Sequence, residues 1–583
     1  MKTDCSFSSI ILAAGYGTRL RPLTELIPKP LLPLSDRTLL ENILLNLETA
    51  GIAKFAVNTH HLGEILHESI KGSDWQEQIT LFPEKEILGT GGPLVNAKEM
   101  LAGYDSFILH NGDILSDIDL RKLRDFHTES GAAVTMVLID GPENKVSVDS
   151  AGKITDILGR LERAGNADTL MTYAGIACFS PAIFDYLPDF PENCSVITAI
   201  LDMMREKPGS AAGYIPDKPF YWNDLGTVDK FTDAVRDIQT GAITLQPTRK
   251  DFRQIAMPLV PLPRQGSERL FMRFDGQGAK DESRIVMCSS ADSADFERFC
   301  RIGKFLHQLN LGTPEIYTLN QTNHTVVMED LGDAALFSII TDKPENQIEN
   351  YYRKVLAYLV RLQAETCEKV TGETDDETGT DKLRLRFFDY KYLRWETEYF
   401  KENFLLGRCG IDKQSVSGLD EEFHTLAERC LSHPQVMIHR DFQSQNIIIQ
   451  NTAVRIVDFQ GARIGHIAYD PASLINDPYV FLPEKLRSSL ISYYFELASA
   501  ETKLARMLEG YDFEELYRAA AMQRGMQALG AYAFLSMKKK KYEYSRFFRP
   551  GLELLLETIR MNNDFPKIAA ILDTAERSLG TSL

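Results

Sequence analysis

Along the first 240 residues, short apolar runs alternate with segments in which apolar residues recur at helical spacing. Short apolar runs that end at Gly, Asp, Asn or Pro are typical of buried strands; the runs are SIILAAG, KFAVNTHH, ITLFPE, SFILHNGD and AVTMVLID. After the first run, residues 38–51 have helical spacing and end at a glycine, Gly51. One face of this expected helix carries Leu40, Ile43, Leu44 and Leu47. Alternation of strands and helices predicts an α/β domain, with a mostly parallel sheet covered by helices on both faces.

Two further inferences follow from this pattern. Residues 146–158, VSVDSAGKITDIL, alternate around a Ser-Ala-Gly turn and predict a hairpin outside the core sheet. In a mostly parallel sheet, ligands bind at the carboxyl ends of the strands. We therefore look for chemistry immediately after the predicted strands.

The pattern changes after residue 240. Residues 241–265 lack clear periodicity and predict a linker between a first domain, 1–240, and a second, 266–583. Strand-like runs dominate the next 70 residues or so: RLFMRF, SRIVMCS and HTVVMED. From about residue 345 the chain is mainly helical, apart from VMIHRDFQSQNIIIQNTAVRIVDFQ. A β-rich lobe (about 266–335) before a larger helical lobe (about 336–583) is the layout of a kinase.

Composition narrows the class of protein. A chain of 583 residues is too long for one core. No apolar run approaches the roughly 20 residues of a membrane helix, and no signal peptide is expected. The eight cysteines form no CxxC pair, which indicates reduced thiols in the cytoplasm. A formal net charge of -18 disfavours general nucleic-acid binding, and the basic run Lys538–Lys541 is better explained as a solvated helix end.

Cations and glycines nevertheless gather after the first strand. In ILAAGYGTRLRPLTELIPKP, Gly15 and Gly17 follow the strand, and Arg19 and Lys29 follow the glycines. Glycines at this position let backbone N–H groups approach a phosphate. A GxGxxG dinucleotide motif would need glycine where Leu20 stands, and no GxxxxGK[ST] motif is present. The segment therefore predicts an anion site of another kind, in which Arg19 offers a planar fork and Lys29 a point charge.

Residues 7–235 resemble the sugar-1-phosphate nucleotidyltransferases, through the glycine loop, NTHHLGE, LGTGGPL, NGD, TYAGI and WNDLGT. LGTGGPL and WNDLGT are most similar to N-acetylmuramate-1-phosphate uridylyltransferases and mannose-1-phosphate guanylyltransferases. The resemblance implies a Rossmann-like domain, Mg²⁺ as cofactor and UTP as co-substrate. It implies contacts to nucleotide by Ala13, Ala14, Gly15, Gly17, Thr18, Arg19, Lys29, Gly91, Asn111 and Gly112, with Arg19 and Lys29 catalytic. It also implies contacts to the sugar by Thr172 and Gly175, and metal binding by Asp113 and Asp224.

This family's reaction explains why no general base is evident. The attacking oxygen of a sugar-1-phosphate is already anionic, so it needs no proton acceptor. Catalysis then depends on in-line positioning and on neutralising charge on the departing pyrophosphate.

A second motif indicates a site that does need a proton acceptor. HRDFQSQN fits HxDxxxxN, and IVDFQ follows it after a strand-like run. In kinases the first Asp accepts or orients the proton of a hydroxyl, while the Asn and the later Asp bind Mg²⁺. The corresponding residues are Asp441, Asn446 and Asp458. This site predicts phosphorylation of a neutral hydroxyl by ATP, and we expect Asp470 to brace its loop.

Residues 255–560 resemble the aminoglycoside phosphotransferase and choline kinase superfamily, a two-lobed, protein-kinase-like α+β fold. GSERLFMRF, DFQ and IAYDPASLINDPY are most similar to N-acetylmuramate or N-acetylglucosamine anomeric kinases. The resemblance implies a phosphate loop at Gly266 and Ser267 and an adenine contact between Glu329 and Leu331. One departure is that Met287 or Cys288 stands where kinases carry a third-strand lysine; Arg269 or Arg273 could supply the cation.

The two resemblances fit successive reactions, because an anomeric kinase makes a sugar-1-phosphate and a nucleotidyltransferase consumes one. We expect a bifunctional salvage enzyme for an amino sugar of cell-wall or glycan precursors, as in peptidoglycan recycling. Three alternatives stay open. They are a choline kinase joined to a phosphocholine cytidylyltransferase, a GTP-using hexose-1-phosphate guanylyltransferase joined to a hexose kinase, and a nucleotide-sensing regulator. The sequence leaves the sugar, the base and the oligomeric state undetermined.

Overall fold

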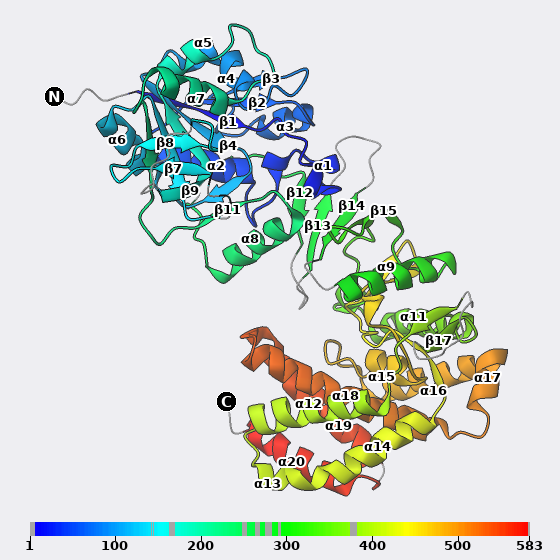
Figure 1. Ribbon diagram of the computed structural model, residues 1–583. Helices are drawn as coiled ribbons and strands as arrows, with labels where there is room; N and C mark the ends of the chain where they lie inside the picture. Colours follow the sequence, from blue (N-terminus) through cyan, green and yellow to red (C-terminus); the bar gives the residue numbers. More distant parts are fainter. Residues whose placement is uncertain are drawn as a thin grey trace. The chain divides into compact units, whose positions relative to one another are not determined.

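The computed structural model describes residues 6–141, 143, 145–161, 169–247, 253–262, 269–274, 283–289, 293–372, 382–561 and 563–580 (Figure 1). The chain forms two compact units. The first comprises Met1–Ser293 and Tyr317–Asp330, and the second comprises Ala294–Ile316 and Leu331–Leu583.

A twisted sheet is the centre of the first unit. Its strand order is β10-β6-β9-β4-β1-β2-β3. The bounds are β1 (Phe7–Leu12), β2 (Phe55–Thr59), β3 (Ile79–Pro83), β4 (Ser106–Asn111), β6 (Val134–Ile139), β9 (Thr169–Phe179) and β10 (Ala211–Tyr214). Neighbours in this order are parallel except β9, which runs antiparallel to both β4 and β6. The expectation of a mostly parallel sheet is confirmed.

Side chains alternate between the two faces of this sheet. On β1, Ile11 belongs to one apolar core and Ile10 to the other; on β4 the same holds for Ile108 and Leu109. The first core is closed by α2 (Leu39–Thr49), α6 (Leu120–Ser130) and α8 (Val228–Thr240). The second is closed by α4 (Gly92–Asn96), α5 (Lys98–Leu101) and α7 (Val196–Glu206). Because both faces are covered, the strands read as nearly continuous apolar runs.

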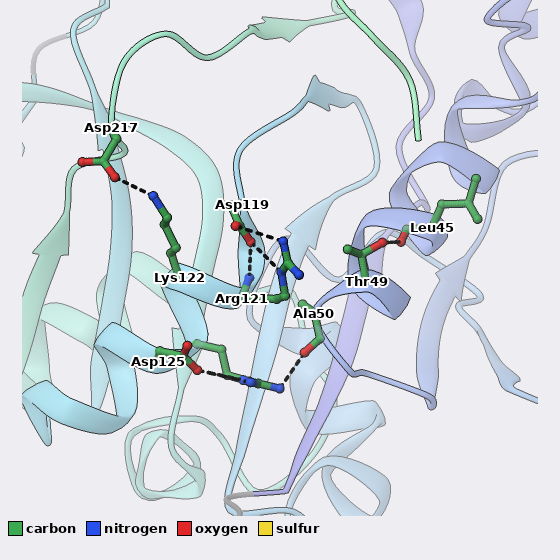
Figure 2. A network of polar contacts seen from close by, with 9 residues as sticks. Leu45, Thr49, Ala50, Asp119, Arg121, Lys122, Asp125 and Asp217 are labelled. Carbon is green, nitrogen blue, oxygen red and sulfur yellow. Dashed lines mark hydrogen bonds and ion pairs between the residues drawn. The ribbon is translucent and has the colours of Figure 1, made fainter. Parts of the chain in front are cut away.

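The helix expected at residues 38–51 is confirmed as α2. Thr38 caps it by accepting a hydrogen bond from the backbone N of Glu41 at 3.1 Å. Its end is joined to α6, where Arg124 Nη1 donates to the carbonyl oxygen of Ala50 at 2.7 Å. Figure 2 shows this region, with Asp119 accepting from Arg121 at the start of α6 and Lys122 paired with Asp217. The Arg124 contact joins α6 to the C-terminal end of α2, whereas Lys122 joins α6 to the loop after β10.

The expected hairpin at residues 146–158 is also confirmed. β7 (Val146–Val148) and β8 (Ile154–Ile157) are antiparallel, and β7 pairs in turn with the first residues of β9. The pair branches from the main sheet, as expected.

A second, five-stranded sheet also belongs mainly to the first unit. Its order is β12-β13-β14-β16-β15, and the bounds are β12 (Leu259–Pro261), β13 (Leu270–Phe274), β14 (Arg284–Cys288), β15 (Ile316–Asn320) and β16 (Thr325–Glu329). The buried residues Leu270, Met272, Val286 and Val327 join the same apolar core as α2 and α8.

This arrangement differs from the division expected from the sequence. The segment 241–265, expected as a linker, contributes β12 and places Ile243 and Ile255 in the first core, 3% and 1% exposed. The sheet expected in the N-terminal lobe of the second domain therefore shares a core with the first domain. Alternating apolar residues predict that these strands have a buried face, but they do not predict which partner buries it.

The second unit is largely helical. Its long helix α18 (Phe513–Met537) is buried along most of its length and packs against α12 (Tyr390–Phe400), α14 (Asp420–Ser432), α15 (Tyr469–Ile475) and α19 (Phe548–Arg560). The other long helices are α9 (Ser293–Gln308), α11 (Glu345–Thr366), α16 (Glu484–Ala500) and α20 (Pro566–Gly580). Two short antiparallel pairs, β19 (Gln435–Ile438) with β22 (Arg463–His466) and β20 (Ile447–Gln450) with β21 (Ala453–Ile456), interrupt the helices. Within the described ranges, no helix combines the length and apolar character needed to cross a bilayer.

Candidate active sites

A cavity of about 420 Å³ opens at the carboxyl ends of β1, β2 and β4. Its lining includes ten residues that the sequence assigned to nucleotide or metal: Ala13, Ala14, Gly15, Gly17, Thr18, Arg19, Lys29, Asn111, Gly112 and Asp113. The volume lies in the range of ordinary ligand pockets. The cavity therefore gathers most of the residues predicted for the first site, but not Asp224.

The floor of this cavity is fixed by a chain of hydrogen bonds that sequence reasoning missed. The backbone N of Ala13 donates to Asn58 Oδ1 at 2.6 Å, and Asn58 Nδ2 donates to Glu84 Oε1 at 2.7 Å. The second carboxylate oxygen of Glu84 accepts from the backbone N of Leu88 at 3.1 Å. The signal in the sequence was a polar residue, Asn58, at the end of an otherwise apolar strand.

The glycine loop has one position that only glycine fits. Gly17 has φ +58, and a Cβ there would lie 2.7 Å from Thr24 Cγ2. Thr24 Oγ1 donates to the carbonyl oxygen of Gly17 at 2.8 Å, which holds the turn. Gly15 differs, since a Cβ there would meet no heavy atom within 4 Å. Gly17 therefore shapes the loop, while Gly15 leaves open space at the cavity wall.

The two predicted metal ligands lie at neighbouring ends of an antiparallel pair of strands: Asp113 immediately precedes β5 (Ile114–Ser116), and Asp224 is the last residue of β11 (Trp222–Asp224). Asp224 pairs with Ile114 in the antiparallel register, and the backbone N of Leu225 donates to the carbonyl oxygen of Asp113 at 2.8 Å. Each carboxylate meets a lysine: Lys29 Nζ is 2.7 Å from Asp113 Oδ2, and Lys230 Nζ is 2.6 Å from Asp224 Oδ2. Sequence reasoning missed Lys230.

Arg19 lies close to Asp224, beside Gly226. A Cβ on Gly226 would lie 2.6 Å from Asp224 Oδ1 and 2.9 Å from Arg19 Nη2, so both groups approach this glycine. Arg19 is exposed, and its side chain lines the cavity. The site thus combines two carboxylates, two lysines and a guanidinium, the groups suited to a magnesium nucleotide.

Four residues predicted for the first site lie outside the lining: Asp224, described above, and Gly91, Thr172 and Gly175. Gly91 precedes α4, and a Cβ there would lie 2.7 Å from Cys194 Sγ, so its small size serves packing. Thr172 accepts a hydrogen bond from the backbone N of Glu143. Gly175 has φ +78, and a Cβ there would lie 2.8 Å from the side chain of Asn111, which does line the cavity. Gly175 therefore acts on the cavity wall through Asn111.

The second predicted cluster lies in the second unit, on the loops between β19 and β22. Asn446 Nδ2 donates to the carbonyl oxygen of Asp441 at 2.9 Å. The backbone N of Val457 donates to the carbonyl oxygen of Asn446 at 3.0 Å. Asp458 follows Val457 in the left-handed conformation, φ 64. A Cβ on Gly461 would lie 3.8 Å from Asp441 Oδ2, so the turn after Asp458 lies beside the Asp441 carboxylate. The three predicted residues converge.

Buried carboxylates brace the loop that carries Asp441. Asp470 accepts from the backbone N of His439 at 2.6 Å and of Arg440 at 2.9 Å. Asp477 accepts from the backbone N and the hydroxyl of Ser444. The bracing role expected for Asp470 agrees with this geometry, whereas sequence reasoning missed Asp477.

Cations set the protonation state of Asp441. Burial alone would raise its pKa, but the guanidinium groups of Arg440 and Arg524 hold the pKa below its usual value. In contrast, burial raises the pKa of Asp470 to about 7, although its hydrogen bonds from His439 and Arg440 oppose the shift. Asp441 is therefore an ionised carboxylate at neutral pH, as a proton acceptor must be.

The remaining kinase predictions fall on the five-stranded sheet and its neighbours. Met287 and Cys288 on β14 are fully buried, so the third strand presents no lysine. Arg273 forms a bidentate ion pair with Asp330, at 2.7 and 3.2 Å. Arg269 is 7% exposed, and Glu329 and Leu331 lie at and just after the end of β16. Gly266 and Ser267 lie outside the described residues.

Comparison with protein families finds two matches in this chain, one before and one after residues 242–263. Residues 8–241 match the family described as "Nucleotidyl transferase", and residues 264–508 match the "Phosphotransferase enzyme family". The chain therefore joins a nucleotidyl transferase domain to a phosphotransferase domain, and the expected Rossmann-like and kinase-like fold classes are confirmed.

Two curated relatives each match about two fifths of this chain. A "Mannose-1-phosphate guanylyltransferase" of Mycobacterium tuberculosis is 29% identical over 235 residues, which are 40% of this chain and 65% of that protein. A "UTP--glucose-1-phosphate uridylyltransferase" of Synechocystis is 30% identical over 252 residues, 40% of this chain and 63% of that protein. The chain thus spans just under two thirds of these relatives. A solved structure of HddC from Yersinia pseudotuberculosis with GMP-PN is 22% identical, covers 40% of this chain and 100% of that one, and has a TM-score of 0.33.

Proposed function

We propose that the chain is a bifunctional sugar-salvage enzyme of the cytoplasm. Its phosphotransferase domain transfers the γ-phosphate of ATP to the anomeric hydroxyl of an N-acetyl amino sugar, N-acetylmuramate or N-acetylglucosamine. Its nucleotidyl transferase domain then converts the sugar-1-phosphate and UTP into a UDP-sugar and pyrophosphate. The observation that carries the proposal is the different use of carboxylates at the two sites. The ionised Asp441 can accept the proton of a hydroxyl, whereas Asp113 and Asp224 are each paired with a lysine, and Arg19 and Lys29 line the cavity where an anion would bind.

In the kinase step, the anomeric oxygen attacks the γ-phosphorus of ATP, its proton passes to Asp441, and ADP leaves. Asp441 is suited to this role because arginines keep its pKa low, so it is ionised at neutral pH. Asn446 and Asp458 would hold Mg²⁺, and their position beside Asp441 supports this assignment.

In the transfer step, a phosphate oxygen of the sugar-1-phosphate attacks the α-phosphorus of UTP, and pyrophosphate leaves. Arg19 and Lys29 would neutralise the charge that develops on pyrophosphate, since both line the cavity. No proton has to be removed, because the nucleophile is an anion.

Magnesium fits the first site. Among the described residues, no group of three or more His, Cys, Asp or Glu side chains could hold a metal ion by itself. Mg²⁺ in nucleotide enzymes usually takes one or two carboxylates together with phosphate oxygens. Asp113, just before β5, and Asp224, at the end of β11, would supply those carboxylates, and bound Mg²⁺ would supply positive charge to the phosphates. Lys29 and Lys230 would then exchange part of their contact with the carboxylates for the phosphates.

The base and the sugar are the finer parts of the proposal. Of the relatives named above, one is a guanylyltransferase by name and the other a uridylyltransferase whose name includes UTP. The motifs LGTGGPL and DFQ support an amino sugar. The test is product analysis of the purified full chain with Mg²⁺, ATP, one of UTP, GTP or CTP, and one free sugar. The expected product is a UDP-amino sugar that depends on both nucleotides. Turnover of choline with ATP and CTP, without sugar turnover, would replace the proposal with the cytidylyltransferase alternative.

A further inference from the structure

The hairpin between β15 and β16 reaches the cationic loop of the first site. Asn320 Nδ2 donates to the carbonyl oxygen of Arg21 at 3.1 Å. Asn323 Nδ2 donates to the same oxygen and, at 3.5 Å, to the carbonyl oxygen of Arg19. All four residues belong to the first compact unit, where α1 (Leu23–Leu26) lies near the five-stranded sheet (Figure 1).

The amide of Asn320 is fixed in the orientation that this contact needs. Its Oδ1 accepts from the backbone N of Thr322 at 3.1 Å and of Asn323 at 3.2 Å. Since the oxygen faces the turn of the hairpin, the NH₂ group faces away from it, toward Arg21. The donor is therefore oriented by the hairpin itself.

The loop that receives these donors has little regular structure of its own. Arg19 lies in a helical turn of three residues, Thr18–Leu20, and the next residues are Arg21 and Pro22. A turn this short closes few internal hydrogen bonds, and proline has no N–H to contribute. Because the Arg19 side chain is long and exposed, the position of its guanidinium depends on how firmly this backbone is held.

We propose that Asn320 and Asn323 are positioning residues for nucleotidyl transfer, which hold the backbone of Arg19 and Arg21 so that Arg19 meets the triphosphate. This inference rests on the proposed function of the first site. It gives the five-stranded sheet a second role, because strands expected in the kinase's N-terminal lobe complete the transferase site. The two activities are then not separable by dividing the chain at residues 241–265.

The test uses Asn320→Asp and Asn323→Asp in the full chain. Aspartate keeps the shape and the acceptor oxygen but lacks the NH₂ donor, and it sets a negative oxygen against a carbonyl oxygen. We expect kcat/KM for the nucleoside triphosphate to fall about ten-fold in each, mainly through KM, while KM for the sugar-1-phosphate changes less than about two-fold. The control is Thr322→Ala, an exposed residue of the same turn, which should stay within about two-fold of wild type. Equal changes in all three variants would overturn the proposal.

A double-mutant cycle separates positioning from a general loss of structure. If Asn323 acts through Arg19, then Asn323→Asp should lower kcat/KM by less than about two-fold when Arg19 is already alanine. Independent, multiplying effects of the two substitutions would contradict the inference.

Hydrogen exchange tests the contact without relying on turnover. Amides of residues 18–26 should exchange faster in Asn323→Asp than in wild type and Thr322→Ala, in the absence of any substrate. Unchanged exchange would refute the brace, whatever the reaction. Faster exchange in a chain whose wild type makes no nucleotide sugar would instead support the brace and refute the proposed function.

Discussion

The two candidate sites hold their key carboxylates in opposite ways. In the first, Asp113 and Asp224 are partly exposed and each meets a lysine, Lys29 or Lys230, at hydrogen-bonding distance. In the second, the loop that carries Asp441 is held by hydrogen bonds to buried Asp470 and Asp477. The charges that lower the pKa of Asp441 come mainly from Arg440 and Arg524.

Under the proposed function, the difference follows from the nucleophile that each site uses. An anionic phosphate oxygen needs its charge balanced, so carboxylates there serve the metal and cations serve the phosphates. A neutral hydroxyl needs a proton acceptor, so the carboxylate must be ionised and aimed, and its loop must be rigid. The same cofactor and similar co-substrates therefore require different surroundings.

Among the substitutions that test this comparison, Asp441→Asn is expected to change a reaction rate the most. Removing the proton acceptor should lower sugar phosphorylation about 10³-fold, while transfer to added sugar-1-phosphate should be unchanged. Phosphorylation is measured as ADP formed, and transfer as pyrophosphate released. Asp113→Asn is the matched control, since it should give the reverse pattern. Loss of both reactions in either variant would contradict the assignment of two separate sites.

The buried acids of the second unit predict a dependence of stability on pH. Burial raises the pKa of Glu396 to about 7, above its ordinary value near 4.5, although Arg440 and a hydrogen bond from Gln523 oppose the shift. The folded state therefore binds the proton more tightly than the unfolded chain does, and stability falls as pH rises from about 4.5 to 7. The shift in the pKa of Glu396 corresponds to a loss of at most about 3 kcal/mol in the free energy of unfolding.

Glu396→Gln should remove this contribution. The free energy of unfolding in guanidinium chloride, compared at pH 5 and pH 8, should fall less with pH in the variant than in wild type. Glu349→Gln is a control at an acid whose pKa is lowered by its hydrogen bond with Arg353. An identical pH dependence in wild type and Glu396→Gln would show that Glu396 titrates as in the unfolded chain.

Within the first site, the two lysines should differ. The side chain of Lys29 is 13% exposed and lines the cavity, whereas that of Lys230 is 44% exposed. Lys29→Met should lower kcat/KM for transfer about 100-fold, because a less exposed charge is less screened by water. Lys230→Met should lower it about ten-fold or less. Pyrophosphate release with each variant measures both values, and equal losses would show that the exposure of the lysine does not matter.

Much of the first site could be predicted because its residues follow strands directly. Glycines and charges after the first apolar run located Gly17 and Arg19, and the resemblance to nucleotidyltransferases implied Asp113. The parallel strands bring these residues to one cavity. Asn58 and Glu84 were not predicted, since their roles come from hydrogen bonds that join three strands. The second site was predicted from a fixed local spacing, Asp441 to Asn446, which depends little on tertiary structure.

The contacts that could not be predicted are those far apart in sequence. The brace from Asn320 to Arg21 spans 299 residues, and no local pattern marks it. Likewise, Lys230 follows Asp224 by six residues, but only the turn from β11 into α8 brings its Nζ to that carboxylate. The pairing of the five-stranded sheet with the first core has the same cause, because apolar strands do not specify their partner.

The smallest expected effect concerns the glycine loop. Gly17→Ala should cost about 1–2 kcal/mol in stability through its left-handed backbone, with added strain from contact between the new Cβ and Thr24. Gly15→Ala should cost less than about 0.5 kcal/mol, since a Cβ there meets no atom within 4 Å. Thermal unfolding of both variants measures the difference, and a Gly15→Ala that is the less stable of the two would contradict the assigned roles.

The central claim is that one chain activates a neutral sugar hydroxyl at Asp441 and then uses the resulting anion at the Arg19 and Lys29 site. The most direct measurement is ³¹P NMR of the purified chain with an N-acetyl amino sugar, ATP and Mg²⁺, followed by addition of UTP. The account predicts that a sugar-1-phosphate signal accumulates first and is then converted into UDP-sugar and pyrophosphate. Phosphorylation at another hydroxyl, or a sugar-1-phosphate that UTP and GTP both leave unchanged, would contradict it.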